Sequence, residues 1–139
     1  MIFKDMKRFV IHTDGGARGN PGPAGIGVLI EDEDGNTVIE HSRYLGEATN
    51  NQAEYQAVID ALEQAKERGA EELEFRLDSE LVVRQLNGDY RVKDQELAKL
   101  FLRVWNLRNS FRKVTFAHVR REQNKQADRL ANEAMDRAS

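Results

Sequence analysis

Five stretches of the chain are rich in apolar and β-branched residues, either continuous or alternating with polar ones, and this pattern predicts β-strands. They are residues 8–16, 25–32, 37–45, 73–78 and 113–119. Asp14 and Asp78 each fall where a strand is expected to give out, because aspartate is uncommon inside strands. Residues 32–36 predict a hairpin turn, so the first three strands are expected to form an antiparallel meander.

Four stretches are predicted as helices, at residues 50–68, 80–87, 94–108 and from 124 onward. Thr49 or Asn50 is the expected N-cap of the first helix, and Gly69 is expected to end it. Glu54 falls on the apolar stripe of this helix, which is an unusual place for a carboxylate. In the last helix Asp128 also borders the apolar stripe.

The helix predicted at residues 94–108 carries apolar residues at helical spacing: Leu97, Leu100, Phe101, Val104 and Trp105. Trp105 belongs to this stripe, so we expect it in the core rather than exposed as a platform for stacking bases.

The order of elements, three strands followed by helix, strand, two helices, strand and helix, predicts an α/β fold. Right-handed crossovers would make the first, fourth and fifth strands parallel. In such sheets the functional crevice lies beyond the carboxyl ends of the strands, where both Asp14 and Asp78 are expected.

Length and composition limit what the chain can be. With 139 residues, 40% of them hydrophobic, it has room for one core, so we expect a single domain over residues 1–139 with its core at about 7–137. The absence of cysteine excludes disulfides and thiolate zinc sites. No apolar run at the N-terminus is long enough for a signal or a membrane span, so we expect a cytoplasmic protein without membrane contact.

Charge is unevenly distributed along the chain. The net charge is −3, but residues 82–125 hold eleven basic and four acidic residues, a net of +7, which leaves −10 for the rest. Such asymmetry is typical of a basic face that contacts a polyanion beside an acidic region that holds cations. An ordinary salt-bridged surface would give the same count, so charge alone leaves both readings open.

Four carboxylates stand out by their positions: Asp14, Glu54, Asp78 and Asp128. If gathered in one pocket they would repel each other and would need cations. Oxygen ligands favour Mg²⁺ or Mn²⁺, and two such ions about 3.5–4 Å apart suit phosphodiester hydrolysis. The alternative is that the four residues take part in separate surface salt bridges.

Four segments in this order resemble type 1 ribonuclease H, in the compact form common in archaea and many bacteria. They are TDGGARGNPGPAG at 13–25, TNNQAEY at 49–55, DS at 78–79 and NKQADRLA at 124–131. The resemblance covers about residues 7–134 and implies the ribonuclease H-like fold. That fold is a five-stranded mixed sheet of order 3-2-1-4-5, with strands 1–3 antiparallel, strands 1, 4 and 5 parallel, and helices on both faces.

The resemblance also implies a function. Asp14, Glu54, Asp78 and Asp128 match the catalytic residues that bind two Mg²⁺ ions, with Mn²⁺ as a substitute. The implied reaction is endonucleolytic hydrolysis of RNA in an RNA–DNA hybrid by a monomer, leaving 5′-phosphate and 3′-hydroxyl ends. Double-stranded RNA stays open as a further substrate. A binding module without catalysis and a nuclease for another polymer are the alternatives, and the four retained carboxylates disfavour the first.

Eight positions are expected to contact the substrate: Gly15, Asn20, Thr49, Asn50, Asn51, Lys93, Arg120 and Arg121. The three asparagines match positions in the minor groove of the hybrid, where amides can distinguish RNA by its 2′-hydroxyl groups. Thr49 matches a hydroxyl that holds a phosphate of the DNA strand. As alternatives, Thr49 or Asn50 only caps the helix and Asn20 only shapes a turn.

The chain departs from larger family members in three places. Its loop at 119–123 lacks their histidine, so Arg120 or Arg121 could hold the scissile phosphate, and we expect His118 to be structural. A basic helix is missing after residue 88, which leaves substrate grip to Arg91, Lys93 and the arginines of the following helix and predicts weaker, salt-sensitive affinity. Asp94 stands where many members have an asparagine of the DNA-phosphate pocket, and a carboxylate there would repel phosphate.

Overall fold

The computed structural model describes residues 7–138, so the N-terminal residues 1–6, where no signal or membrane span is expected, lie outside the described residues. In chain order the elements are β1 (Arg8–Ala17), β2 (Gly22–Glu31), β3 (Thr37–Ala48), α1 (Asn50–Glu67), β4 (Glu72–Leu77), α2 (Glu80–Leu86), α3 (Gln95–Arg108), β5 (Lys113–His118), a short 3₁₀ turn η1 (Arg121–Gln123) and α4 (Lys125–Ala138). Within this range no helix combines the length and the apolar character needed to cross a bilayer.

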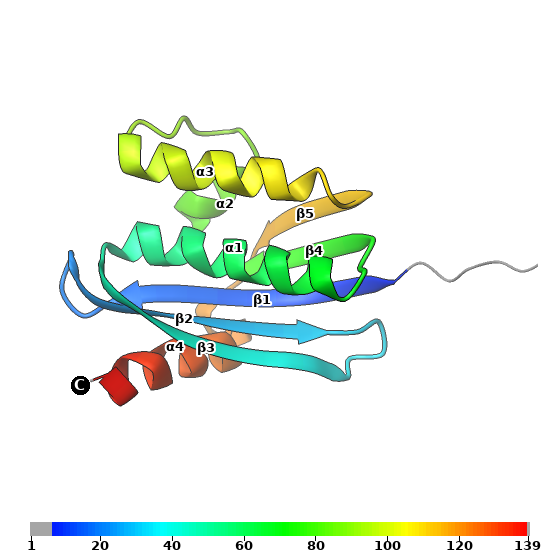
Figure 1. Ribbon diagram of the computed structural model, residues 1–139, viewed down its shortest axis with the longest axis horizontal. Coiled ribbons are helices and arrows are strands. Elements are labelled where there is room, and N and C mark those ends of the chain that lie inside the picture. The colour runs from blue at the N-terminus through cyan, green and yellow to red at the C-terminus, as the bar shows by residue number, and fades with distance from the viewer. Residues whose placement is uncertain (1–6, 139) are drawn as a thin grey trace, which may run out of the picture.

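The strands form one mixed sheet in the order β3-β2-β1-β4-β5, which confirms the predicted topology. β1 pairs antiparallel with β2, and β2 with β3, whereas β1–β4 and β4–β5 are parallel. Figure 1 shows α1 on one face of the sheet and α4 on the other, with α3 lying outside α1. The helices therefore cover both faces, as predicted.

The first three strands are longer than predicted. β1 continues past Asp14 to Ala17, β2 begins at Gly22 rather than residue 25, and β3 extends to Ala48 rather than residue 45. Asp14 nevertheless lies where β1 leaves β4, because the parallel ladder between them ends at His12. The expected strand end at Asp14 is thus wrong for the pairing with β2 and correct for the pairing with β4.

Glycines in β1 and β2 let two helices lie directly on the sheet. A Cβ atom on Gly15 would lie 2.3 Å from the carbonyl carbon of Ala53 in α1, and one on Gly27 would lie 2.1 Å from the carbonyl oxygen of Ala127 in α4. Glycine has a low strand propensity, but any larger side chain here would push a helix away. Side chains of α1 and α4 can therefore reach the ends of the central strands.

The prediction that Trp105 lies in the core is wrong, because its side chain is 47% exposed. α3 packs on α1 rather than on the sheet, so only a narrow seam of it, including Leu97 and Val104, is buried. Trp105 lies beside this seam, with the ring of Phe101 at 6.3 Å and the guanidinium of Arg108 at 4.6 Å from its ring.

A buried carboxylate ties α1 to β3. Asp60 accepts hydrogen bonds from Arg43 at 2.7 and 2.8 Å, from His41 at 3.0 Å and from Gln56 at 3.0 Å. Burial disfavours its charge, but these hydrogen bonds and the Arg43 charge outweigh burial and hold the pKa of Asp60 well below its usual range. The sequence offered no signal for Asp60, because its basic partners, Arg43 and His41, come from β3.

Candidate active site

The parallel pairing of β1 with β4 brings two aspartates together. The ladder runs from Arg8 opposite Glu72 to His12 opposite Arg76. Continuing this register by two residues places Asp14 beside Asp78, just beyond the last residue of β4. The expected meeting of two carboxylates at this edge of the sheet is therefore found.

Helix α1 adds a third carboxylate from the face of the sheet opposite α4. Thr49 caps this helix by accepting a hydrogen bond from the Gln52 N–H at 3.1 Å, and Glu54 follows one turn later. Oε1 of Glu54 accepts a 2.7 Å hydrogen bond from the Gly15 N–H. Glu54 is only 6% exposed, and its Oε2 is buried without a hydrogen-bond partner among the described residues.

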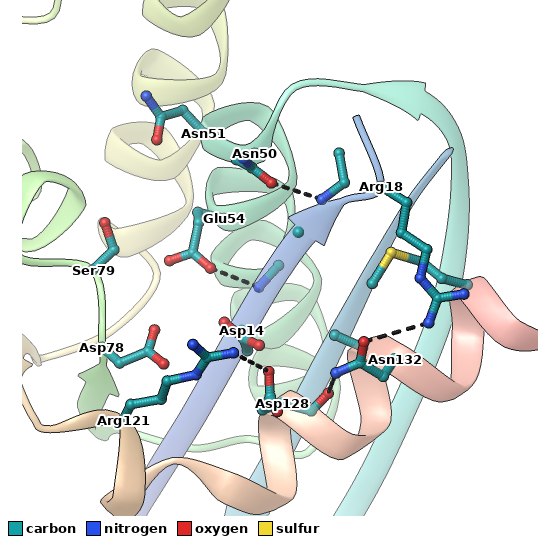
Figure 2. Close-up of a pocket in the computed structure, with 15 residues that line it drawn as sticks. Asp14, Arg18, Asn50, Asn51, Glu54, Asp78, Ser79, Arg121, Asp128 and Asn132 are labelled. Carbon is teal, nitrogen blue, oxygen red and sulfur yellow. Dashed lines mark hydrogen bonds and ion pairs between the residues drawn. The ribbon is translucent and has the colours of Figure 1, made fainter. Parts of the chain in front are cut away.

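The carboxylates converge on one cleft (Figure 2). Asp14, Glu54 and Asp78 each present an oxygen within 4.8 Å of the others. Asp128, from the first turn of α4, lines the same cleft of about 480 Å³, and its Oδ1 lies 4.0 Å from Nη2 of Arg121. All four predicted carboxylates therefore reach one place, with Asp128 outside the tightest group.

The acidic cluster is electrostatically strained. Burial is the main cause that raises the pKa of Asp14, and the neighbouring charges of Glu54 and Asp78 raise it further. Burial also raises the pKa of Glu54, although the Gly15 N–H opposes this effect. The pKa of Asp78 is raised by burial and by Asp128, with Arg121 acting in the opposite direction. Three neighbouring carboxyl groups thus resist full ionisation.

The donor set suits a hard divalent cation. The cluster offers carboxylate oxygens only, and one of them is a buried oxygen without a partner. A bound cation would satisfy this oxygen and offset the repulsion that raises the three pKa values. Asp14, Glu54 and Asp78 are the residues that fit such an ion most closely, and Asp128 lines the same cleft.

The raised pKa values predict how stability depends on pH when no metal is bound. A carboxyl group whose pKa is higher in the folded state costs stability once pH exceeds its unfolded pKa of 3.8 for Asp or 4.5 for Glu. We therefore expect the Tm in EDTA to fall from about pH 5 to about pH 8. Added Mg²⁺ or Mn²⁺ should reduce that fall. Thermal melts at both pH values check this, and a Tm in EDTA that is independent of pH would contradict it.

Four of the eight predicted substrate positions line the cleft: Gly15, Asn50, Asn51 and Arg121. Asn50 also holds the local backbone, because its Oδ1 accepts a 2.8 Å hydrogen bond from the Ala17 N–H. Oδ1 of Asn20 in turn accepts from the Asn50 N–H at 3.1 Å. These asparagines join the β1–β2 turn to the start of α1.

The other four predicted substrate positions lie outside the lining of this cleft: Asn20, Thr49, Lys93 and Arg120. Thr49 is the N-cap of α1, so the capping alternative holds for its hydroxyl. Lys93 and Arg120 are exposed, and Lys93 lies on the link between α2 and α3.

Sequence reasoning missed three polar residues of the cleft, Arg18, Ser79 and Asn132. Arg18 forms an ion pair with Asp136 at 2.6 Å and a 3.5 Å hydrogen bond with Asn132. Asn132 lies one helical turn after Asp128, and its Nδ2 donates to the Asp128 carbonyl. The spacing of Asn132 from Asp128 was an available signal, whereas the contact of Arg18 with α4 needed the fold.

Two of the departures noted in the sequence take a definite form. His118 is exposed at the end of β5, so it is not packed as a structural histidine. It is also among the groups that lower the pKa of Asp78. Asp94 is the N-cap of α3, and its Oδ1 accepts a 2.9 Å hydrogen bond from the Leu97 N–H. Capping explains a carboxylate at this position.

The basic segment is only partly free for a polyanion. Arg84 pairs with Glu80, Lys99 with Glu96, and Arg103 with Glu63. Within residues 7–138 no ion pair holds Arg91 or Lys93. Some basic residues of residues 82–125 thus belong to an ordinary salt-bridged surface, whereas within the described range Arg91 and Lys93 are free to contact a polyanion.

Comparison with known proteins agrees with the fold. A family model described as reverse transcriptase-like matches residues 12–134. The bifunctional protein Rv2228c of Mycobacterium tuberculosis is 45% identical over 133 residues, which are 95% of this chain and 36% of that protein. Ribonuclease HI of Halobacterium salinarum is 46% identical over 127 residues, covering 91% of this chain and 64% of the relative. The chain thus spans about a third and about two thirds of the lengths of these two relatives.

Solved structures match over nearly their whole length. LC11-RNase H1 in complex with an RNA/DNA hybrid has a TM-score of 0.90 and 50% identity, covering 94% of this chain and 98% of that one. RNase H1 of Halobacterium salinarum has a TM-score of 0.91 at 44% identity, covering 94% of this chain and 98% of that one. With its sheet order and its converging carboxylates, the chain belongs to the type 1 ribonuclease H family.

Proposed function

We propose that this chain is an endoribonuclease that hydrolyses the RNA strand of RNA–DNA hybrids, using two Mg²⁺ ions for which Mn²⁺ can substitute. The observation that carries the proposal is the convergence of Asp14, Glu54 and Asp78 on a cleft that Asp128 also lines. Its support from relatives is that LC11-RNase H1, 50% identical, has been solved with an RNA/DNA hybrid.

In the proposed reaction the four carboxylates hold the two metal ions between them. Asp14, Glu54 and Asp78 would hold one ion, and Asp128 with the strand-end aspartates would hold the other. When bound, such ions supply an activated water and stabilise the charge that develops on the phosphate and the leaving oxygen. The Gly15 N–H orients Glu54, because it occupies Oε1 and leaves Oε2 buried without a hydrogen-bond partner among the described residues.

The proposed hydrolysis conserves atoms and charge. The water oxygen forms a new bond to phosphorus, and the bond between phosphorus and the 3′-oxygen breaks. The water proton is transferred to solvent and the 3′-oxygen takes up another, which leaves 5′-phosphate and 3′-hydroxyl ends. Arg121 lies near Asp78 and Asp128, and its guanidinium charge supports the proposal that it holds the scissile phosphate.

Substrate choice would come from the asparagines at the start of α1. Asn50 and Asn51 line the cleft, and their amides can both donate to and accept from a 2′-hydroxyl. Unpaired Arg91 and Lys93 would add contacts to phosphates, which makes affinity depend steeply on salt. All these residues come from one chain, so we propose that a monomer is active.

Cleavage of labelled duplexes tests the proposal. RNA–DNA, RNA–RNA and DNA–DNA duplexes of one sequence are incubated with Mg²⁺, Mn²⁺ or EDTA, and the RNA ends are mapped. We expect the hybrid to be cut with either metal and not in EDTA, and DNA–DNA to stay intact. Cleavage of the hybrid in EDTA would overturn the metal mechanism, and equal cutting of DNA–DNA would overturn recognition through the 2′-hydroxyl. The RNA–RNA duplex shows whether the enzyme requires a DNA strand.

A further inference from the structure

The first turn of α4 is joined to β1 by a buried asparagine. Asn124 precedes the helix and is only 1% exposed. Its Nδ2 donates a 2.8 Å hydrogen bond to the carbonyl oxygen of Thr13, the residue before Asp14. The backbone carbonyl oxygen of Asn124 accepts a hydrogen bond from the Asp128 N–H at 3.1 Å. Asn124 therefore links the strand that carries Asp14, through its side chain, to the helical turn that carries Asp128, through its backbone carbonyl.

The orientation of the Asn124 amide assigns a role to His12. Since Nδ2 faces the Thr13 carbonyl, Oδ1 is the atom that lies 3.0 Å from Nδ1 of His12. An unprotonated Nδ1 and the amide Oδ1 are both acceptors and would repel each other at this distance. Nδ1 of His12 therefore carries a hydrogen and donates a hydrogen bond to Oδ1 of Asn124. Nε2 of His12 lies 3.9 Å from Glu31 Oε1 on the neighbouring strand. His12 thus completes the hydrogen bonding of a buried amide.

We propose that His12 is a positioning residue that acts through Asn124 to set where the Asp128 carboxylate lies in the cleft. The inference rests on the proposed function, because it assigns His12 to the metal site of that reaction. His12 touches neither substrate nor metal in this scheme. Its part is to hold the Asn124 side chain, which in turn holds the first turn of α4.

Among the described residues the Asp128 side chain has one ion-pair partner, which is exposed, so the placement of its helical turn matters for where the carboxylate lies. Asp14, Glu54 and Asp78 have oxygens within 4.8 Å of one another, and Asp128 stands outside that group. Its ion-pair partner, Arg121, has an 81% exposed side chain and therefore little restraint of its own. Gly27 sets how closely α4 approaches β2 at Ala127, and the start of the helix before Ala127 is held to β1 by the bond from Asn124 to Thr13.

Three substitutions at one position separate the hydrogen bond from the volume of the ring. His12→Phe keeps a ring and removes the donor, which leaves Oδ1 of Asn124 buried without a partner. His12→Asn restores an amide nitrogen one bond beyond Cγ, where histidine carries Nδ1. His12→Gln carries its amide one bond further out, near the position of Nε2, so it should not restore the bond.

We expect His12→Phe and His12→Gln to raise the Mg²⁺ concentration for half-maximal cleavage about tenfold, and to lower kcat about fivefold. KM for the hybrid should stay within about twofold, because His12 is neither in the cleft lining nor among the expected substrate positions. The rise in Tm that Mn²⁺ induces, measured without substrate, should shrink in both variants. Hydrogen exchange of the Asp128 amide should be faster in both, while amides of α1 keep their protection. His12→Asn should recover wild-type metal response and exchange.

A matched control is His41→Phe, which removes the 3.0 Å hydrogen bond from His41 to Asp60, far from the cleft. It should lower the Tm and leave the Mg²⁺ response unchanged. The inference is overturned if His12→Phe and His12→Gln keep the wild-type metal response, or if His12→Asn behaves like His12→Phe. If His12→Phe does not fold, the comparison of the metal response of His12→Gln with that of His12→Asn tests the inference. A wild type that binds no Mn²⁺ and cuts no hybrid would instead refute the proposed function itself.

Discussion

Asp14→Asn is expected to reduce cleavage of the hybrid by at least about a thousandfold while leaving the metal-free protein as stable as the wild type or more stable. The catalytic loss follows because Asp14 lies at the centre of the cluster, within reach of Glu54 and Asp78. The stability follows because burial and these neighbours already raise the pKa of Asp14, so a neutral side chain relieves repulsion. Single-turnover cleavage and thermal melts in EDTA measure the two effects.

Asp60→Asn is the matched control, because it neutralises another buried aspartate with the opposite environment. Asp60 is surrounded by donors and has a lowered pKa, so its neutralisation should destabilise the fold by about 3 kcal/mol. Cleavage per folded molecule should change little, since Asp60 lies away from the cleft lining. A large loss of Tm in Asp14→Asn, comparable to that of Asp60→Asn, would contradict the repulsive cluster.

Gly15→Ala is expected to destabilise the fold by about 3 kcal/mol and to reduce cleavage about a hundredfold. A Cβ at this position would lie 2.3 Å from the Ala53 carbonyl oxygen and 2.6 Å from the Glu54 nitrogen. These are backbone atoms of α1, so the helix itself must move, and the Glu54 carboxylate moves with it. Urea unfolding measures the first effect, and cleavage rates well below the Tm measure the second.

The neighbouring glycine provides the control for this prediction. A Cβ on Gly16 would meet only Oδ1 of Asn50, at 3.9 Å, which is ordinary contact. Gly16→Ala should therefore change the free energy of unfolding by less than about 1 kcal/mol. If both alanine variants lose stability equally, the close approach of α1 is not the cause.

Much of the site could be predicted because its residues stand at places that local patterns define. Asp78 directly follows a strand, and Glu54 breaks an apolar helical stripe. Parallel strands carry their ends to the same edge of a sheet, so the meeting of Asp14 and Asp78 followed from the predicted topology. The motif resemblance pointed to the same four carboxylates.

Contacts that depend on packing were beyond the reach of these patterns. Trp105 has the spacing of a core residue, but α3 packs on a helix rather than on the sheet, and its buried seam is too narrow to include this ring. The donors to Asp60 come from β3, and the partners of Arg18 come from α4. No local periodicity reports such pairings.

By itself, the sequence determined the elements and the aspartate that follows β4, because hydrophobic period and turn chemistry are local properties. The full order of the sheet was expected from the motif resemblance. The tertiary structure decided how closely the helices approach and how the carboxylates are held. The distances from Gly15 to α1 and from Asn124 to His12 depend on chain segments that are remote in sequence. Those distances place Glu54 and Asp128, and placement to within an ångström governs what a cluster of like charges can bind.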